Sequence, residues 1–132
     1  QQLMVVTRMA RDLDIPITVQ GCATVREASG LAMSSRTLRL SPEALGKAGQ
    51  LYPVLRDLAD QLQTGAAFED LLPAAKVHLA EAGFGELEYL DLRCAETLEP
   101  LSRPDRPARL LVAAWLDGIR LIDNIAVDQL ND

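Results

Sequence analysis

Hydrophobic residues recur at helical spacing through the first thirteen residues and then give way to a short β-branched run. The spacing of three and four predicts a helix over residues 1–13, and IPITVQG predicts a strand over residues 15–21 that ends at Gly21. A helix followed by a strand is half of an α/β crossover unit, so this strand is expected to belong to a parallel sheet. The apolar helical positions are Leu3, Val6, Met9, Ala10 and Leu13.

Two further helices are predicted in the middle of the chain. Ser41 followed by Pro42 is typical of a helix start, and an apolar stripe continues to about residue 63. We expect Pro53 to bend or interrupt this helix. A second stripe over residues 68–79 ends at Gly83, a glycine suited to a left-handed cap. The short TGA link between the stripes predicts an antiparallel helix pair.

After Gly85 the pattern changes to a period of two, which predicts strands. The alternation in ELEYLDL slips between Tyr89 and Leu90, which indicates either a bulge or an uncertain register. Further on, the Asp-Gly pair at 117–118 separates two apolar runs and suits a two-residue type I′ turn, so residues 108–116 and 119–127 are predicted to form a hairpin. The fold class is therefore α+β: a small two-layer domain of two helices on a three-stranded antiparallel sheet, preceded by the helix and strand of residues 1–24.

Composition narrows the class of protein. The 132 residues are 48% hydrophobic, which suits one globular domain, and 13 basic against 19 acidic residues give a net charge of −6. Such a surface lacks the positive field that attracts nucleic acid or anionic lipid, and no apolar run has the length of a membrane span. The two cysteines, Cys22 and Cys94, lack metal-like spacing, so we expect both to be buried thiols of a reduced, cytoplasmic protein.

Few residues outside one loop carry candidate chemistry. His78 is the only histidine, lies in a predicted helix and has no partner at a suitable spacing, so we interpret it as a structural or surface residue. Glu86, Glu88 and Asp91 are typical of the solvated positions of a strand rather than of a catalytic carboxylate pair. No metal-ligand motif is present in the sequence.

The loop TVREASGLAMSSR concentrates polar groups between two elements, where binding residues often lie. Arg36 is able to pair with phosphate oxygens through its planar guanidinium, and the Ser34 and Ser35 hydroxyls can donate further hydrogen bonds. Spacing alone leaves a second interpretation open, because Ser-Ser-Arg is a common tripeptide. In that interpretation the segment is a capped structural loop with Arg36 on an acidic neighbour.

Two groups of motifs carry a family resemblance. TVRE with GLAMSSR, and ARLLVAA with RLIDNI near the end, make the chain similar to the C-terminal part of the pantoate–beta-alanine ligases, over nearly all its length. The resemblance implies an enzyme that uses ATP with Mg²⁺ to activate pantoate as pantoyl adenylate, which beta-alanine then attacks to give pantothenate and AMP. It also implies a Rossmann-like nucleotide-binding domain, related to class I aminoacyl-tRNA synthetases, closed by a smaller C-terminal lid.

The resemblance also implies site residues. Ser34, Ser35 and Arg36 would contact the ATP phosphates, with Met33 just before them and the Val25 backbone near the adenine; Gln2 would bind pantoate. This sequence departs from the family pattern PTVREADGLAMSSRN by having Ala23, Ser29 and Thr37 at the proline, aspartate and asparagine positions. The implied contacts survive these differences.

The resemblance also implies domain boundaries. Residues 1–24 would be the last part of the nucleotide-binding domain, and residues 25–132 the lid. The chain starts in a helical pattern without a capping residue, so we expect it to be part of a longer protein and inactive alone. Residues 1–20 are expected to expose apolar surface and an unpaired strand edge, and we hypothesise that they pack on the small domain or on a second copy in a homo-oligomer.

Two other functions stay open at this point. The domain could be a non-catalytic module in which the helix pair and hairpin serve protein association and the Ser-Ser-Arg loop is structural. It could also be the lid of another adenylate-forming ligase, because pantoate and beta-alanine follow from the resemblance and not from residue spacing.

Overall fold

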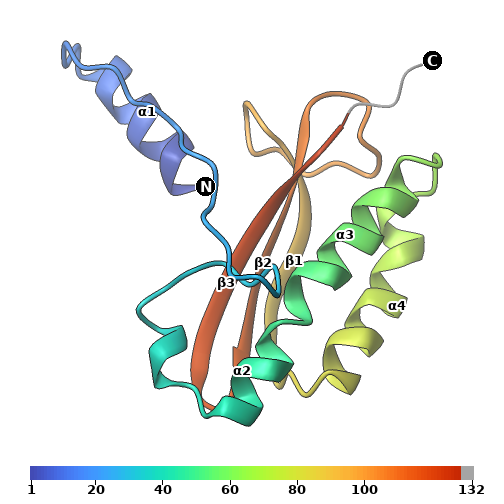
Figure 1. Cartoon of the computed structure of the whole chain (residues 1–132). Coiled ribbons are helices and arrows are strands. Elements are labelled where there is room, and N and C mark those ends of the chain that lie inside the picture. The colour runs from blue at the N-terminus through green and yellow to red at the C-terminus, as the bar shows by residue number, and fades with distance from the viewer. Residues whose placement is uncertain (129–132) are drawn as a thin grey trace.

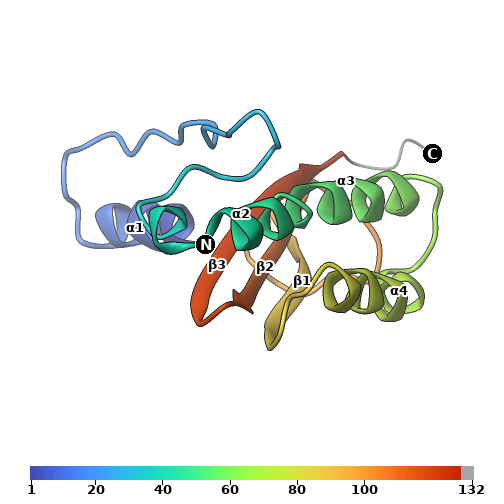
Figure 2. The ribbon, with the colours of Figure 1, turned by 60° about the horizontal axis from the view of Figure 1, so that its bottom comes forward.

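A three-stranded antiparallel sheet with helices on one face forms the body of the molecule (Figure 1). The structure is a computed structural model that describes residues 1–128. The strands lie in the order β1 (Leu87–Cys94), β2 (Ala108–Leu116) and β3 (Ile119–Val127). Helices α2 (Pro42–Ala48), α3 (Leu51–Leu62) and α4 (Phe68–Glu81) pack against the sheet, and α1 (Gln2–Asp12) lies to one side (Figure 2). The predicted α+β class is confirmed, with three helices on the sheet instead of two; residues 129–132 of the predicted lid lie outside the described residues.

The hairpin of β2 and β3 matches its predicted bounds of 108–116 and 119–127. Leu116 pairs with Ile119 across the turn, and Ala108 pairs with Val127 at the far end. The turn residues Asp117 and Gly118 have φ of 47° and 73°, and positive φ at both positions is the signature of a type I′ turn. The Asp-Gly pair therefore fixes the register of the whole hairpin.

The predicted bulge in β1 is confirmed, slightly earlier in the chain than expected. The register with β2 shifts between Leu87 and Tyr89, so Glu88 is the extra residue. Because of this shift Leu87 and Leu90 both face the helices, which explains why the sequence alternation slips.

One long helix over residues 41–63 was predicted, and the structure divides it in two. The Ser41 hydroxyl caps α2 by accepting a hydrogen bond from the Ala44 N–H at 3.1 Å, as expected. The break falls at residues 49–50 and not at Pro53, which lies in the first turn of α3. A proline is tolerated there because the N–H groups of the first turn have no partner within the helix, so the predicted effect of Pro53 is wrong.

The antiparallel pair of α3 and α4 is confirmed. Gly83 ends the second helix with φ of +97°, a conformation that favours glycine. Leucines fill the space between the helices and the sheet, because each helix turns one apolar stripe inward. Fully buried members of this core are Leu51, Leu55, Leu62, Leu110, Val112 and Leu116.

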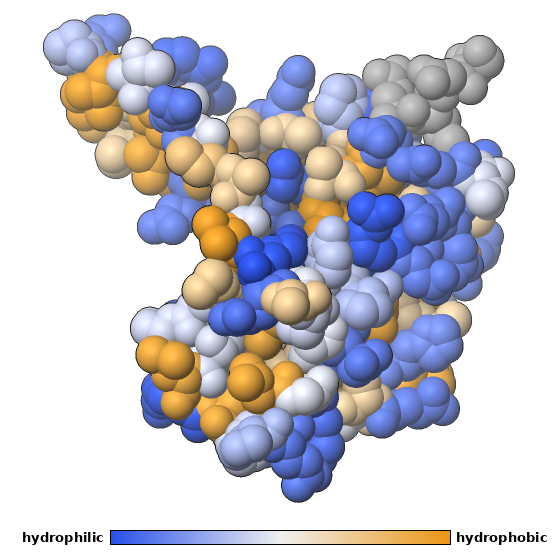
Figure 3. Space-filling model, viewed as in Figure 1, coloured by the Kyte–Doolittle hydropathy of each residue, from blue (hydrophilic) through white to orange (hydrophobic). Residues whose placement is uncertain are grey.

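The strand predicted over residues 15–21 is absent from the structure, and residues 13–24 connect α1 to the domain without a helix or strand. Extended backbone becomes a sheet strand only where another strand pairs with it, and none within residues 1–128 does so. The apolar exposure expected for residues 1–20 is confirmed, since Val5 is 59% and Ile17 61% exposed. Apolar atoms accordingly show on the surface of the α1 arm (Figure 3).

The two cysteines have different surroundings. Cys94 is buried in β1, as predicted, but Cys22 is exposed, so the prediction of burial is wrong for that residue. The reason is that Cys22 lies in the connection of residues 13–24, outside the core of the domain. Both thiols are free.

None of the described helices combines the length and apolar character needed to span a bilayer.

Candidate functional site

The loop singled out by its sequence folds as a small hairpin. The Met33 N–H donates to the Val25 carbonyl at 2.9 Å, and the Glu27 N–H donates to the Leu31 carbonyl at 2.8 Å. Val25 and Met33 are therefore neighbours across the hairpin, and their side chains are 67% and 56% exposed. Residues from both ends of the motif are thus brought together on one surface.

Ser34, Ser35 and Arg36 form a turn that leads into the 3₁₀ helix η1 (Thr37–Arg39). The Ser34 hydroxyl accepts a hydrogen bond from the Arg36 N–H at 3.1 Å. The Ser34 carbonyl accepts bonds from the Thr37 hydroxyl at 2.6 Å and from its N–H at 3.1 Å. Thr37 is buried and anchors the turn, whereas the side chains of residues 34–36 are exposed. The turn therefore presents the side chains of Ser34, Ser35 and Arg36 to solvent, and the buried Thr37 holds it in place.

The Arg36 guanidinium forms one hydrogen bond within the described part of the chain. Its Nη1 donates to the Arg120 carbonyl of β3 at 3.4 Å, a long hydrogen bond. No carboxylate in residues 1–128 lies within ion-pair distance of Arg36. The interpretation of Arg36 as the partner of an acidic neighbour therefore finds no support, and most of its donors remain available to a ligand.

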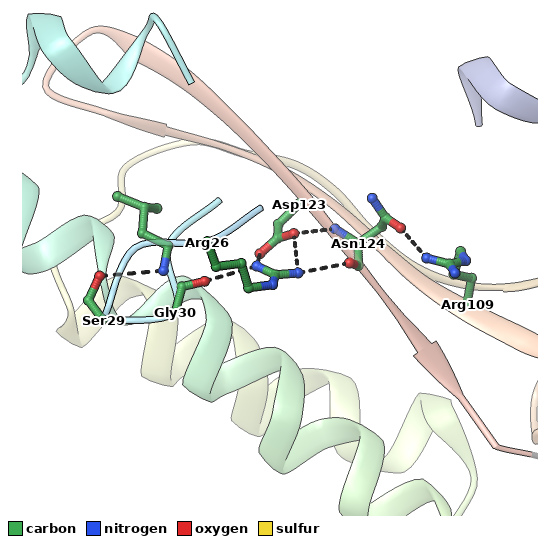
Figure 4. A network of polar contacts seen from close by, with 7 residues as sticks. Arg26, Ser29, Gly30, Arg109, Asp123 and Asn124 are labelled. Atoms are coloured by element: carbon green, nitrogen blue, oxygen red, sulfur yellow. Dashed lines mark hydrogen bonds and ion pairs between the residues drawn. The ribbon is translucent and has the colours of Figure 1, made fainter. Parts of the chain in front are cut away.

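Arg26 fixes the base of the hairpin to the sheet (Figure 4). Its two terminal nitrogens donate to the two carboxylate oxygens of Asp123 at 2.7 and 3.0 Å. They also donate to the carbonyls of Gly30 at 2.9 Å and Asn124 at 3.2 Å. The guanidinium stacks over the Tyr52 ring at 4.1 Å. The pair is largely removed from water, with side-chain exposures of 17% for Arg26 and 1% for Asp123.

The other predicted residues lie elsewhere. Gln2 is exposed in the first turn of α1, and in residues 1–128 it has no side-chain hydrogen bond to the loop, so the structure does not unite it with Ser34–Arg36. His78 is on the exposed side of α4, as interpreted. Glu88 and Asp91 are engaged by arginines of the sheet, at 2.7 Å from Arg120 and 2.9 Å from Arg93. They do not form a catalytic carboxylate pair.

Glu88 gives the site region a pH-dependent contact. The side-chain hydrogen bonds from Arg120 and, second, from Trp115 at 2.6 Å hold the pKa of Glu88 below its ordinary value. A carboxyl whose folded pKa is lowered adds stability above its unfolded pKa and loses that contribution as the pH falls through the folded pKa. This carboxylate therefore stabilises the fold at neutral pH and ceases to do so in acid.

We expect the difference in unfolding free energy between the wild type and Glu88→Gln to be present at pH 7 and to shrink below about pH 4, the range in which glutamate titrates. Trp115 is the only tryptophan, so its fluorescence follows the same titration in the folded state. A fluorescence midpoint above the ordinary glutamate value would contradict the assignment. A stability difference independent of pH would contradict it as well.

Comparison with known proteins identifies the relatives of this chain. The sequence profile described as pantoate-beta-alanine ligase matches residues 1–126. The chain belongs to the pantoate–beta-alanine ligase family. It is 67% identical over 132 residues to the pantothenate synthetase of Ruegeria pomeroyi, and 52% identical over 129 residues to that of Chelativorans sp. strain BNC1. These alignments cover 100% and 98% of this chain.

Solved structures of the family agree with the fold. The crystal structure of pantothenate synthetase from Thermus thermophilus matches 96% of this chain with a TM-score of 0.87 and 42% identity. A pantoate-beta-alanine ligase from Francisella tularensis, complexed with beta-gamma ATP and beta-alanine, matches 95% with a TM-score of 0.66 and 24% identity, which supports the fold alone. The chain spans 46% of the length of the Ruegeria pomeroyi relative and 46% of the Thermus chain.

The family resemblance inferred from the motifs is therefore confirmed, and the structure adds a relation between them. TVRE contains Arg26 and RLIDNI contains Asp123, so the Arg26–Asp123 ion pair joins the two most diagnostic motifs across 97 positions of sequence. The motifs alone predicted no role for Arg26 or Asp123. The available signal was an arginine and an aspartate inside the two motifs that mark the family.

Proposed function

We propose that this chain is the C-terminal part of an ATP-dependent ligase that joins pantoate and beta-alanine, and that the loop of residues 25–36 binds ATP. The observation that carries the proposal is the exposed turn of Ser34, Ser35 and Arg36, with no acidic partner for Arg36 in residues 1–128, in a chain of this family. The activity belongs to the longer protein, and this chain supplies its lid.

The proposal assigns parts to the described elements. Residues 25–132 would be the lid domain, and residues 1–24 would belong to the nucleotide-binding domain that the lid covers. Gln2 would bind pantoate from α1, Val25 would lie near the adenine through its backbone, and Met33 would bind ATP just before the phosphate-binding turn. The exposed position of α1 supports this division, since its apolar side chains have room for a covering domain.

Hydroxyls and a guanidinium suit the adenylation step. When the carboxylate of pantoate attacks the α-phosphorus of ATP, an acyl phosphate bond forms, the bond to the bridging oxygen breaks, and negative charge passes to pyrophosphate. Donors on Ser34, Ser35 and Arg36 aimed at these oxygens would stabilise the transition state more than the ground state. A lid that closes over the adduct would also exclude water from the reactive acyl adenylate.

Magnesium would enter with the nucleotide. Residues 1–128 contain no group of three or more histidine, cysteine or acidic side chains arranged to hold a metal ion. The residues of the loop fit a phosphate chain rather than a bare cation, because hydroxyls and a guanidinium donate hydrogen bonds to its oxygens. Mg²⁺ would therefore be carried by ATP and by the remainder of the enzyme.

Two secondary proposals concern assembly and location. The apolar side chains on α1 and the segment after it, including Val5, Leu13 and Ile17, would be covered in the whole enzyme by the nucleotide-binding domain and, in this chain alone, by a second copy. The free thiols of Cys22 and Cys94 favour a reducing, cytoplasmic location.

The chain of 132 residues alone is expected to form no pantothenate from ATP, pantoate and beta-alanine. The reason is that the lid would present phosphate-binding groups without the domain that holds the nucleotide and pantoate. The measurement is AMP release by the isolated chain, beside the whole enzyme as a control. Turnover by the chain at about 1 s⁻¹ or more, a rate typical of enzymes, would refute the claim that catalysis needs the rest of the enzyme. An inactive whole enzyme would refute the proposed function itself.

A further inference from the structure

The contacts of Arg26 connect three separate pieces of the chain: the hairpin loop, β3 and α3. The guanidinium binds the Gly30 carbonyl inside the hairpin, the Asp123 carboxylate and Asn124 carbonyl on β3, and the Tyr52 ring on α3. Asp123 is also held from its own strand, since its carboxylate accepts a bond from the Asn124 N–H at 2.7 Å. The ion pair is therefore bidentate, and three further hydrogen bonds hold its two side chains in place.

We propose that Arg26 is a positioning residue for the phosphate-binding turn: through Asp123 it sets where Ser34, Ser35 and Arg36 stand relative to the sheet. This inference rests on the proposed function of that turn. Arg26 touches none of the reacting atoms and acts through the hairpin.

The path from Arg26 to the turn is short. Arg26 pairs with Ala32 across the hairpin, and residues 33 and 34 follow directly. At the other end, Arg36 donates to the Arg120 carbonyl, also on β3. Both ends of the loop are thus hydrogen-bonded to residues 120–124 of the edge strand β3. A shift of Arg26 therefore moves the turn relative to β3.

Stability alone does not account well for a buried ion pair at this place. Removing two charges from water costs free energy that their attraction only partly returns, and well-packed apolar residues of similar volume often stabilise a fold equally or better. A bidentate arginine–carboxylate contact, in contrast, fixes both distance and direction. Replacing the ion pair by apolar residues therefore distinguishes stabilisation from positioning. Such a replacement can keep the packing, but it cannot keep the direction of the bidentate contact.

The test compares Arg26→Lys and the double variant Arg26→Met with Asp123→Leu against the wild type, with Arg56→Lys as the matched control. Arg56 forms an exposed ion pair with Asp60 within α3, and neither residue belongs to the loop. The first readout, on this chain, is amide hydrogen exchange at Glu27, Gly30 and Met33, whose N–H groups bond within the hairpin. The second, on the whole enzyme, is KM for ATP beside KM for beta-alanine.

In both Arg26 variants the three loop amides are expected to exchange about tenfold faster than in the wild type, while the β2 amides stay protected. Both variants are also expected to raise KM for ATP about tenfold and to leave KM for beta-alanine unchanged. The double variant is expected to match the wild type in unfolding free energy and still show both effects. Recovery of loop protection and of KM for ATP in the double variant would overturn the inference and leave a structural role. The hydrogen-exchange measurement does not depend on catalysis. Its result therefore remains valid even if an inactive wild-type enzyme refutes the proposed function.

Discussion

Arg36→Ala in the whole enzyme is expected to lower kcat/KM for ATP by tenfold or more, equivalent to about 1.4 kcal/mol of transition-state stabilisation. The guanidinium is exposed, and its one hydrogen bond in the described residues is an exposed 3.4 Å bond to the Arg120 carbonyl, so its removal breaks little within the fold. The unfolding free energy should therefore change by less than about 0.5 kcal/mol, as for other surface substitutions. Steady-state kinetics and a chemical denaturation curve measure the two quantities.

Arg39 supplies the matched control for this experiment. It is also an exposed arginine, lies three positions further on in η1 and is not proposed to contact ATP. Arg39→Ala removes the same charge from the same neighbourhood, so it measures the general electrostatic attraction of ATP. Equal losses in the two variants would contradict a specific contact by Arg36, and unchanged kinetics in Arg36→Ala would favour a structural loop.

Gly30→Ala is expected to destabilise the fold by about 3 kcal/mol, combining backbone strain with a clash. Gly30 has φ of +88°, a region that side chains other than glycine rarely adopt. A Cβ atom at this position would clash with Cδ1 of Tyr52, well inside the contact distance of two carbon atoms. The Tyr52 ring cannot withdraw freely, because it also stacks under the Arg26 guanidinium. Unfolding by denaturant measures the change.

Gly65→Ala separates the two causes. Gly65 has φ of +92°, close to that of Gly30, but a Cβ atom there would meet nothing within 4 Å. It should therefore cost only the strain, about 1 kcal/mol. Adding Tyr52→Leu to Gly30→Ala should relieve part of the clash. Equal destabilisation by Gly30→Ala and Gly65→Ala would contradict the close approach of the loop to α3.

Local sequence signals predicted the sheet well. The Asp-Gly turn determines the hairpin because only a few residue types accept positive φ at both turn positions, and Asp117 and Gly118 show it. The sequence indicates the bulge at Glu88 through Leu87 and Leu90, which are three positions apart. A regular strand would turn them to opposite faces, but both face the core. In each case the information lies within a few neighbouring residues.

Tertiary contacts explain what the sequence did not predict. The segment 15–21 has the composition of a strand, but pairing depends on partners that its own residues do not specify. The division between α2 and α3 at residues 49–50 coincides with a tight approach, since a Cβ on Gly49 would lie 3.3 Å from the Ser29 side chain. Likewise the Arg26–Asp123 pair joins positions 97 residues apart, beyond the reach of any local pattern.

The candidate site was found by family motifs and not by periodicity. Spacing alone left Ser34–Arg36 as either a structural turn or an anion site, and the structure adds the exposure of the three side chains and the absence of an acidic partner for Arg36 in residues 1–128. It brings Val25 and Met33 together through one backbone hydrogen bond. Gln2 stays apart on α1, so its proposed role depends on the domain that would surround that helix.

The central claim, that the turn of residues 34–36 binds the phosphates of ATP, is tested most directly by a crystal structure of the whole enzyme with a non-hydrolysable ATP analogue. We predict that the hydroxyls of Ser34 and Ser35 and the guanidinium of Arg36 lie within hydrogen-bonding distance of phosphate oxygens, about 2.7–3.2 Å. A bound nucleotide whose phosphates contact other residues while this turn faces solvent would contradict the claim.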